Sequence, residues 1–125
     1  MIYTTYFAKL KKLPKDVIPI SICAKPPAGY QGPSYRALAP KYDFYSQWKL
    51  NKDNDYFTCC YNERVLKELN PARVVAELYA QVGKAPCDGD IALVCYEKSA
   101  DFCHRHLVAG WLRNNGYPCK ELLLN

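Results

Sequence analysis

A short stretch of the chain, VCYEKSADFCHRHLV from Val94 to Val108, holds much of its reactive chemistry. It contains both histidines, two of the seven cysteines, a glutamate and an arginine. Cys103 stands beside a histidine and an arginine, a setting that favours a thiolate nucleophile, and plain packing is the alternative. Glu97 is a candidate general base or hydroxyl acceptor, unless it serves only as a carboxylate at a helix start. The residue types therefore predict a functional site.

Three further side chains of this stretch are candidate ligand contacts. Arg105 is predicted to clamp an anion or, alternatively, to tie the end of a strand to a helix. Cys95 is a second candidate, although a buried strand cysteine is usually a small hydrophobic residue, and a redox pair with Cys103 is a third interpretation. His104 and His106 are two residues apart and face different ways on a helix, so we assign only His104 to the site.

The elements that must position these residues are a strand, a short turn and a helix. The apolar run from Ile91 to Tyr96 is typical of a central strand that is covered on both faces. Ser99 or Asp101 is expected to cap a helix from about Ala100 to Asn115. Ligands of open α/β sheets bind beyond the carboxyl ends of strands, where the positive end of a helix dipole attracts anions. We therefore expect this helix tip to face an open crevice.

The remaining chain alternates predicted strands with predicted helices. Proline weakens the second predicted strand, because Pro19 cannot donate to a central ladder, so we expect it at the strand's start. The pattern predicts an α/β layered domain with a small, mostly parallel sheet flanked by helices. The other predicted strands are 2–7, 17–23 and the terminal CKELLLN; the other predicted helices lie in 41–50, 56–69 and from Pro71 to about Gly83.

A long irregular segment from Ala24 to Pro40 is rich in proline and glycine. Such a loop in a compact domain is often a binding loop, so Tyr30, Tyr35 and Arg36 are predicted ligand contacts. The tyrosines of this loop, together with Tyr3 and Tyr6, are also predicted to stack on a base.

Length and charge restrict the possible functions. The 125 residues suit one domain, 1–125, and the formal net charge of +5 attracts anions such as nucleotides mildly. A solvated surface with some excess lysine explains that charge equally well. Four lysines close to tyrosines suggest nucleic-acid binding as a further alternative. These are Lys9, Lys11, Lys12 and Lys15.

The seven cysteines indicate a reducing compartment. No signal-like segment precedes Ile2 and no apolar stretch approaches the roughly 20 residues that span a bilayer, so we expect a cytoplasmic protein with free cysteines and no membrane contact. No CxxC pair occurs, and adjacent Cys59 and Cys60 are a poor spacing for zinc, so we predict no metal and no cofactor. GxGxxG, P-loop, HExxH and GxSxG motifs are also absent from the sequence.

The segment ALVCYEKSADFCHRHLVAGWL resembles the signature of the bacterial and phage proteins known as "domain of unknown function 488". That signature is an apolar strand ending in Cys-x-Glu, then a spacer and Cys-His-Arg at a helix start; here it falls on Cys95, Glu97, Cys103, His104 and Arg105. The segments IYTTYFAKLKKLP and GYQGPSYRALAPKYDFYSQWK also resemble the short, phage-associated branch of that family. The resemblance implies a Rossmann-like α/β domain and little about activity.

Three functions remain open from the sequence. The first is a small-molecule site for an anionic or nucleotide-like ligand around residues 95–105, acting on a nucleoside or phosphoester if the protein is an enzyme. The second is a phage-type protein without catalysis that sequesters a signalling nucleotide or blocks a host protein. The third is a nucleic-acid-binding module. The sequence specifies neither the ligand nor the oligomeric state, and it leaves open whether a reaction is catalysed.

Overall fold

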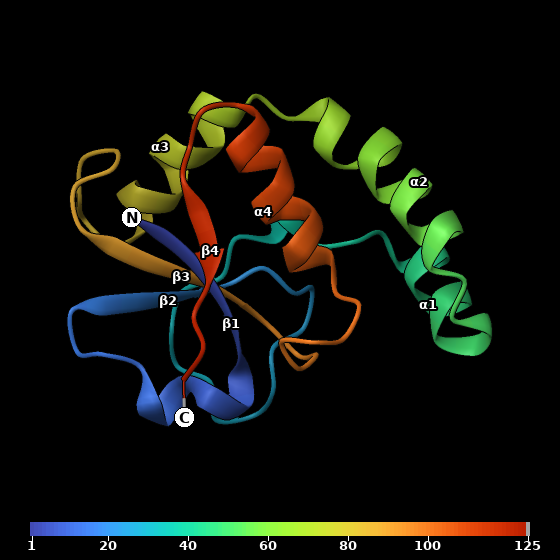
Figure 1. Ribbon diagram of the computed structural model, residues 1–125, viewed down its shortest axis with the longest axis horizontal. Helices are drawn as coiled ribbons and strands as arrows, with labels where there is room; N and C mark the ends of the chain where they lie inside the picture. Colours follow the sequence, from blue (N-terminus) through green and yellow to red (C-terminus); the bar gives the residue numbers. More distant parts are fainter. Residues whose placement is uncertain (125) are drawn as a thin grey trace.

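Four parallel strands form the sheet at the centre of the molecule (Figure 1), in a computed structural model that describes residues 1–124. Within these residues the strand order is β2–β3–β1–β4, and each pair of neighbours is parallel. This architecture confirms the predicted α/β class with a parallel sheet. The strands are β1 (Ile2–Tyr6), β2 (Val17–Ser21), β3 (Asp90–Cys95) and β4 (Cys119–Glu121).

Strand β3 lies between β2 and β1, and its residues from Ile91 to Cys95 are all buried, as the continuous apolar run predicts. Strand β2 forms an edge of the sheet and carries Pro19 in its middle, paired with Ala92, so the prediction that this proline starts the strand is wrong. Ser21, two residues further along, donates its N–H away from β3 to the carbonyl of Pro33. An N–H at position 19 would point the same way as that of Ser21, away from β3. Proline at this position therefore costs the ladder no hydrogen bond.

The four α-helices fall into two pairs. Helices α3 and α4 lie on the same side of it, whereas α1 and α2 pack against each other to one side (right in Figure 1). The predicted start of α3 is confirmed, because the Asn70 side chain accepts a hydrogen bond from the N–H of Arg73 and Pro71 is the first helical residue. The helices are α1 (Tyr42–Asn51), α2 (Asn54–Arg64), α3 (Pro71–Gln81) and α4 (His104–Asn114).

Helix α4 begins later than the sequence predicts. Its N-cap is Cys103, with no side-chain capping hydrogen bond, rather than Ser99 or Asp101. The Ser99 hydroxyl is instead used elsewhere, since it donates to the carboxylate of Glu121 at 2.6 Å. The residues between β3 and α4 therefore form a longer turn, which brings the Cys-His-Arg triplet itself to the helix start.

A single apolar cluster of buried residues joins the sheet to all four helices, from Ile2 of β1 to Cys119 of β4. Tyr61 of α2 is fully buried in it and donates its hydroxyl to the carbonyl of Leu38 at 2.5 Å. This bond ties α2 to the 3₁₀ turn Arg36–Leu38 that ends the long loop. Across residues 1–124, none of the helices has the length and apolar character needed to cross a membrane.

Candidate functional site

A cavity of about 570 Å³ opens at the carboxyl ends of β2 and β3. Cys95 is the last residue of β3, Cys23 follows β2, and Cys103 and His104 form the start of α4. All four line the cavity, so the strand–turn–helix junction does border a hollow of the size that small molecules occupy. This is the place where open parallel sheets bind ligands.

Aromatic side chains of α1, of α2 and of the turn before α4 form one wall of the cavity. Tyr45 and Trp48 of α1 have ring centroids 6.4 Å apart in a stacked arrangement, and Trp48 also contacts Phe57 and Phe102. The Trp48 indole N–H donates to Asn54 Oδ1 at 2.7 Å, which fixes the ring. The wall is therefore apolar and composed of planar groups.

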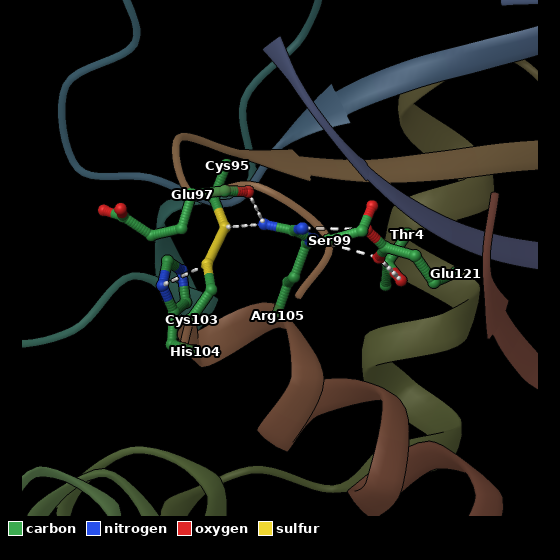
Figure 2. A network of polar contacts seen from close by, with 8 residues as sticks. All are labelled: Thr4, Cys95, Glu97, Ser99, Cys103, His104, Arg105 and Glu121. Atoms are coloured by element: carbon green, nitrogen blue, oxygen red, sulfur yellow. Dashed lines mark hydrogen bonds and ion pairs between the residues drawn. A yellow bond between two sulfur atoms is a disulfide. The ribbon is translucent and has the colours of Figure 1, made fainter. Parts of the chain in front are cut away.

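Charged groups surround this aromatic wall. Lys25, Lys49 and Lys52 line the cavity, and the Lys52 ammonium lies 3.8 Å from the centroid of the Trp48 ring. Glu97 is the acidic residue among the described lining residues, and its carboxylate points away from Arg105 (Figure 2). The hydrogen bonds and ion pairs within residues 1–124 leave that carboxylate without a protein partner. The cavity thus combines lysine ammonium groups with one unpaired carboxylate.

The cysteines of the junction are in two chemical states. Cys95 and Cys103 are joined by a disulfide, whereas Cys23 beside them is a buried free thiol. The prediction of free thiols is therefore wrong for Cys95 and Cys103, and their pairing is the third interpretation that the sequence allowed. Burial raises the pKa of Cys23 to about 12, so this thiol is protonated at neutral pH. The other free cysteines are Cys59, Cys60, Cys87 and Cys119.

His104 is held in one tautomer by its main-chain partner. Its Nε2 lies 2.8 Å from the carbonyl oxygen of Ile22, which can only accept, so Nε2 carries the proton and Nδ1 keeps its lone pair. Burial lowers the pKa of His104 to about 4, and the ring is therefore neutral at pH 7. Nδ1 lies 3.9 Å from the sulfur of Cys103.

Arg105 is fully buried and forms the structural tie that the sequence offered as the second interpretation (Figure 2). Its Nε and Nη2 donate to the two carboxylate oxygens of Glu121 at 3.0 and 2.8 Å. Its Nη1 donates to the carbonyl of Glu97 at 2.7 Å and to the sulfur of Cys95 at 3.3 Å. Since these contacts occupy the guanidinium, and Arg105 is not among the described residues lining the cavity, its position does not support the anion clamp.

The other predicted contacts lie elsewhere. The Tyr30 hydroxyl bonds to the main chain of Pro19, Ser21 and Pro33, and the Tyr35 hydroxyl donates to Glu77 at 2.6 Å. Both side chains therefore brace the long loop. None of the five predicted loop and tyrosine contacts is among the described lining residues: Tyr3, Tyr6, Tyr30, Tyr35 and Arg36.

Sequence reasoning missed three groups of residues. Cys23 carries no local motif, and only the pairing of β2 with β3 brings it beside Cys95. Glu121 lies in a strand of three residues that is far from Arg105 in the sequence but adjacent to it in the fold. The third group lies on α1, where the helical spacing of Tyr45 and Trp48 predicts a helix but not that its face lines a cavity.

The fold and the site together define an α/β protein whose parallel sheet carries a ligand-sized cavity at the carboxyl ends of its strands. The chain belongs to the DUF488 family, because the family model described as the active DUF488-N3 subclade matches residues 2–116. This match confirms the resemblance seen in the sequence. Searches of the curated proteins and of the solved structures gave no significant match.

Proposed function

We propose that the cavity at the carboxyl ends of β2 and β3 binds a planar, anionic small molecule of nucleotide type. The observation that carries the proposal is the meeting of stacked aromatic rings, lysine ammonium groups and a free carboxylate around one hollow of about 570 Å³. A nucleotide presents the complementary chemistry, since its base is planar, its phosphate is anionic and its sugar carries hydroxyl donors.

The three parts of such a ligand have distinct partners. The half-buried rings of Tyr45 and Phe102 offer faces and edges for the base. Lys49 and Lys52, at the end of α1, are the proposed partners of the phosphate, together with Lys25 from the segment after β2, because all three line the cavity. The carboxylate of Glu97 is suited to accept hydrogen bonds from the sugar hydroxyls.

The proposal has a catalytic form and a binding form. In the catalytic form Glu97 takes a proton from a water molecule that attacks a nucleoside or phosphoester bond, and Cys103 is a nucleophile only after its disulfide is reduced. In the binding form the protein sequesters the ligand unchanged, and the disulfide that occupies Cys103 favours it.

One experiment tests binding and separates the two forms. Purified protein is incubated with a panel of nucleosides and nucleotides, and binding is followed by tryptophan fluorescence, because Trp48 lines the cavity whereas Trp111 does not. Bound ligand is then released by heat and identified by mass spectrometry. Ligand recovered unchanged supports the binding form, altered ligand supports catalysis, and no fluorescence change with any member overturns the proposal.

Matched lysine variants locate the ligand. The double variant Lys49→Ala/Lys52→Ala removes two cationic groups of the cavity. We expect it to lower the affinity for phosphate-containing ligands at least tenfold, since hydrogen bonds to charged groups contribute about 1.5–3 kcal/mol each. The control Lys11→Ala/Lys12→Ala removes the same charge from the 3₁₀ turn Phe7–Lys12, outside the cavity lining. Equal weakening by both variants would show that the site is elsewhere.

Nucleic-acid binding stays a separate prediction, because Lys9, Lys11 and Lys12 cluster in the turn after β1. A single-stranded oligonucleotide bound through these lysines would lose affinity steeply as the salt concentration rises. The control variant just described would then weaken oligonucleotide binding and leave mononucleotide binding unchanged.

A further inference from the structure

Metal-ligand atoms from three distant parts of the sequence meet at the floor of the cavity. The sulfurs of Cys23 and Cys95 and a ring nitrogen of His104 all lie within 4.8 Å of one another, and all three residues are buried. Cys103 adds a third sulfur, which is bonded to Cys95 and lies 3.9 Å from His104 Nδ1. The end of β2, the end of β3 and the start of α4 therefore bring two sulfurs and one imidazole within 4.8 Å of one another, with the third sulfur, that of Cys103, beside Cys95 and His104.

The imidazole of His104 is already oriented as a ligand. Metal-binding histidines almost always donate their second ring N–H to a carboxylate, a main-chain carbonyl or a water molecule, which fixes the tautomer and the ring. Here Nε2 donates to the carbonyl of Ile22 at 2.8 Å, and Nδ1 keeps a free lone pair on the side of the sulfurs. The Ile22 bond alone would suit any buried histidine, so the feature that points to a metal ligand is Nδ1, which faces the sulfurs with its lone pair unused.

We propose that the reduced protein binds Zn²⁺ through Cys23, Cys95, Cys103 and His104. Three thiolates and one imidazole match the tetrahedral nitrogen and sulfur coordination that zinc prefers in closed sites. This inference goes beyond the proposed nucleotide site, because the ion would fix the cavity floor whether or not a ligand occupies the space above it.

Zinc and the Cys95–Cys103 disulfide exclude each other, because a sulfur bonded to sulfur is not a thiolate. A dithiol or phosphine reductant breaks that bond by supplying two electrons, and the two sulfurs take up two protons from water. Coordination of Zn²⁺ by three thiols then releases three protons to solvent. The chain therefore has two states at this position, one oxidised and metal-free and the other reduced and able to bind the ion.

Arg105 balances the charge of the metal-bound state. Zn²⁺ with three thiolates and a neutral imidazole carries one net negative charge, which is unfavourable in a buried place. The Nη1 group of Arg105 already donates to the sulfur of Cys95 at 3.3 Å. A hydrogen bond from a cation to a metal-bound thiolate is the kind of outer contact that stabilises such centres.

The test is a titration of the reduced 125-residue chain with Co²⁺, whose visible absorption reports its coordination geometry. The protein is reduced with a phosphine under anaerobic conditions, freed of reductant and titrated with Co²⁺ and then with Zn²⁺. We expect one equivalent of Co²⁺ to give the strong visible bands of tetrahedral thiolate coordination, and Zn²⁺ to abolish them. Protein left in the disulfide form should give no bands.

Variants and a second measurement keep the proposal falsifiable. Cys23→Ser and His104→Gln should each weaken Co²⁺ binding by at least tenfold, whereas the control Cys59→Ser/Cys87→Ser, which removes two exposed thiols, should bind as the wild type does. If a buried substitution unfolds the chain, X-ray absorption of the zinc-loaded wild type decides, with three sulfur and one nitrogen neighbours expected. Absence of the cobalt bands, loss of binding in the control, or an oxygen-dominated zinc spectrum would overturn the proposal.

Discussion

Arg105 and Glu121 form a bidentate ion pair in which the Arg105 side chain is fully buried and the Glu121 side chain is 16% exposed. The two residues lie on α4 and β4, so the pair fastens the helix to the edge strand. Thr4 and Ser99 add hydrogen bonds to the same carboxylate, each at 2.6 Å. The network (Figure 2) therefore links β1, the β3–α4 turn, α4 and β4 through one charged group.

We predict that Arg105→Ala destabilises the protein by about 3–5 kcal/mol, because it leaves the Glu121 carboxylate without its cation in a largely buried place. Arg105→Lys should recover only part of the loss, since an ammonium group cannot reproduce the two parallel hydrogen bonds. Denaturant unfolding measures both changes. The control Arg64→Ala breaks an exposed ion pair with Asp43 and should cost far less than Arg105→Ala, and an equal cost for both arginines would contradict the structural tie.

The same network predicts a dependence of stability on pH. Burial alone would raise the pKa of Glu121, but hydrogen bonds from Arg105, Ser99 and Thr4 outweigh it and lower the pKa below its usual value of 4.5. At pH values between the lowered pKa of the folded state and 4.5, the unfolded state binds more protons than the native state. The contribution of Glu121 is therefore present above pH 4.5 and is lost as the pH falls through the lowered pKa.

Urea unfolding between pH 7 and pH 3 measures this contribution. Glu121→Gln should lower stability at pH 7 and should reduce the loss of stability on acidification. Glu63→Gln, which removes an exposed carboxylate from a surface pair, should keep the wild-type dependence. If the free energy of unfolding of Glu121→Gln fell with pH as steeply as that of the wild type, another group would be the cause of the acid sensitivity.

Thiol reactivity should follow burial. In native protein without reductant, we expect a haloacetamide to label exposed Cys59 and Cys87 first, whereas Cys23 and Cys119 react only after unfolding. Burial raises the pKa of these two thiols to about 12 and about 11, so both accessibility and thiolate content are low. Peptide mass spectrometry identifies the labelled residues.

A second labelling step checks the disulfide. Cys95 and Cys103 should stay unlabelled in denatured protein until a reductant is added, because a disulfide persists on unfolding whereas burial and metal protection do not. Labelling of both residues in denatured, unreduced protein would mean that they are free thiols in the sample.

The sequence predicts local features of the site well and long-range features poorly. The continuous apolar run of β3 and the Cys-His-Arg triplet indicate a strand, a turn and a helix because both signals lie within a few residues. The start of α4 is mispredicted because Ser99 is a good capping residue in isolation but is bound by Glu121 in the fold. Local propensity contains no information about that distant partner.

The composition of the cavity depends on contacts that no local pattern encodes. Cys23 meets Cys95 through parallel strand pairing, and Trp48 reaches the cavity because α1 packs beside the sheet's carboxyl end. The loop-based prediction for Tyr30 gains no support from the structure, since its hydroxyl satisfies main-chain groups of its own loop and of β2. A tyrosine in a long loop is therefore weak evidence for ligand contact when the loop itself needs bracing.

The last prediction concerns the bond that fixes α2 to the long loop. Tyr61→Phe removes the buried hydroxyl and leaves the Leu38 carbonyl without this donor, so we expect a loss of about 1–3 kcal/mol in denaturant unfolding. The aromatic ring itself, stacked on Phe57, is retained, which separates the hydrogen bond from packing. The control Tyr42→Phe alters a ring that is 81% exposed and should change stability by less than about 0.5 kcal/mol. Equal stability of Tyr61→Phe and wild type would mean that the Leu38 carbonyl finds another partner and that α2 is held by apolar contacts alone.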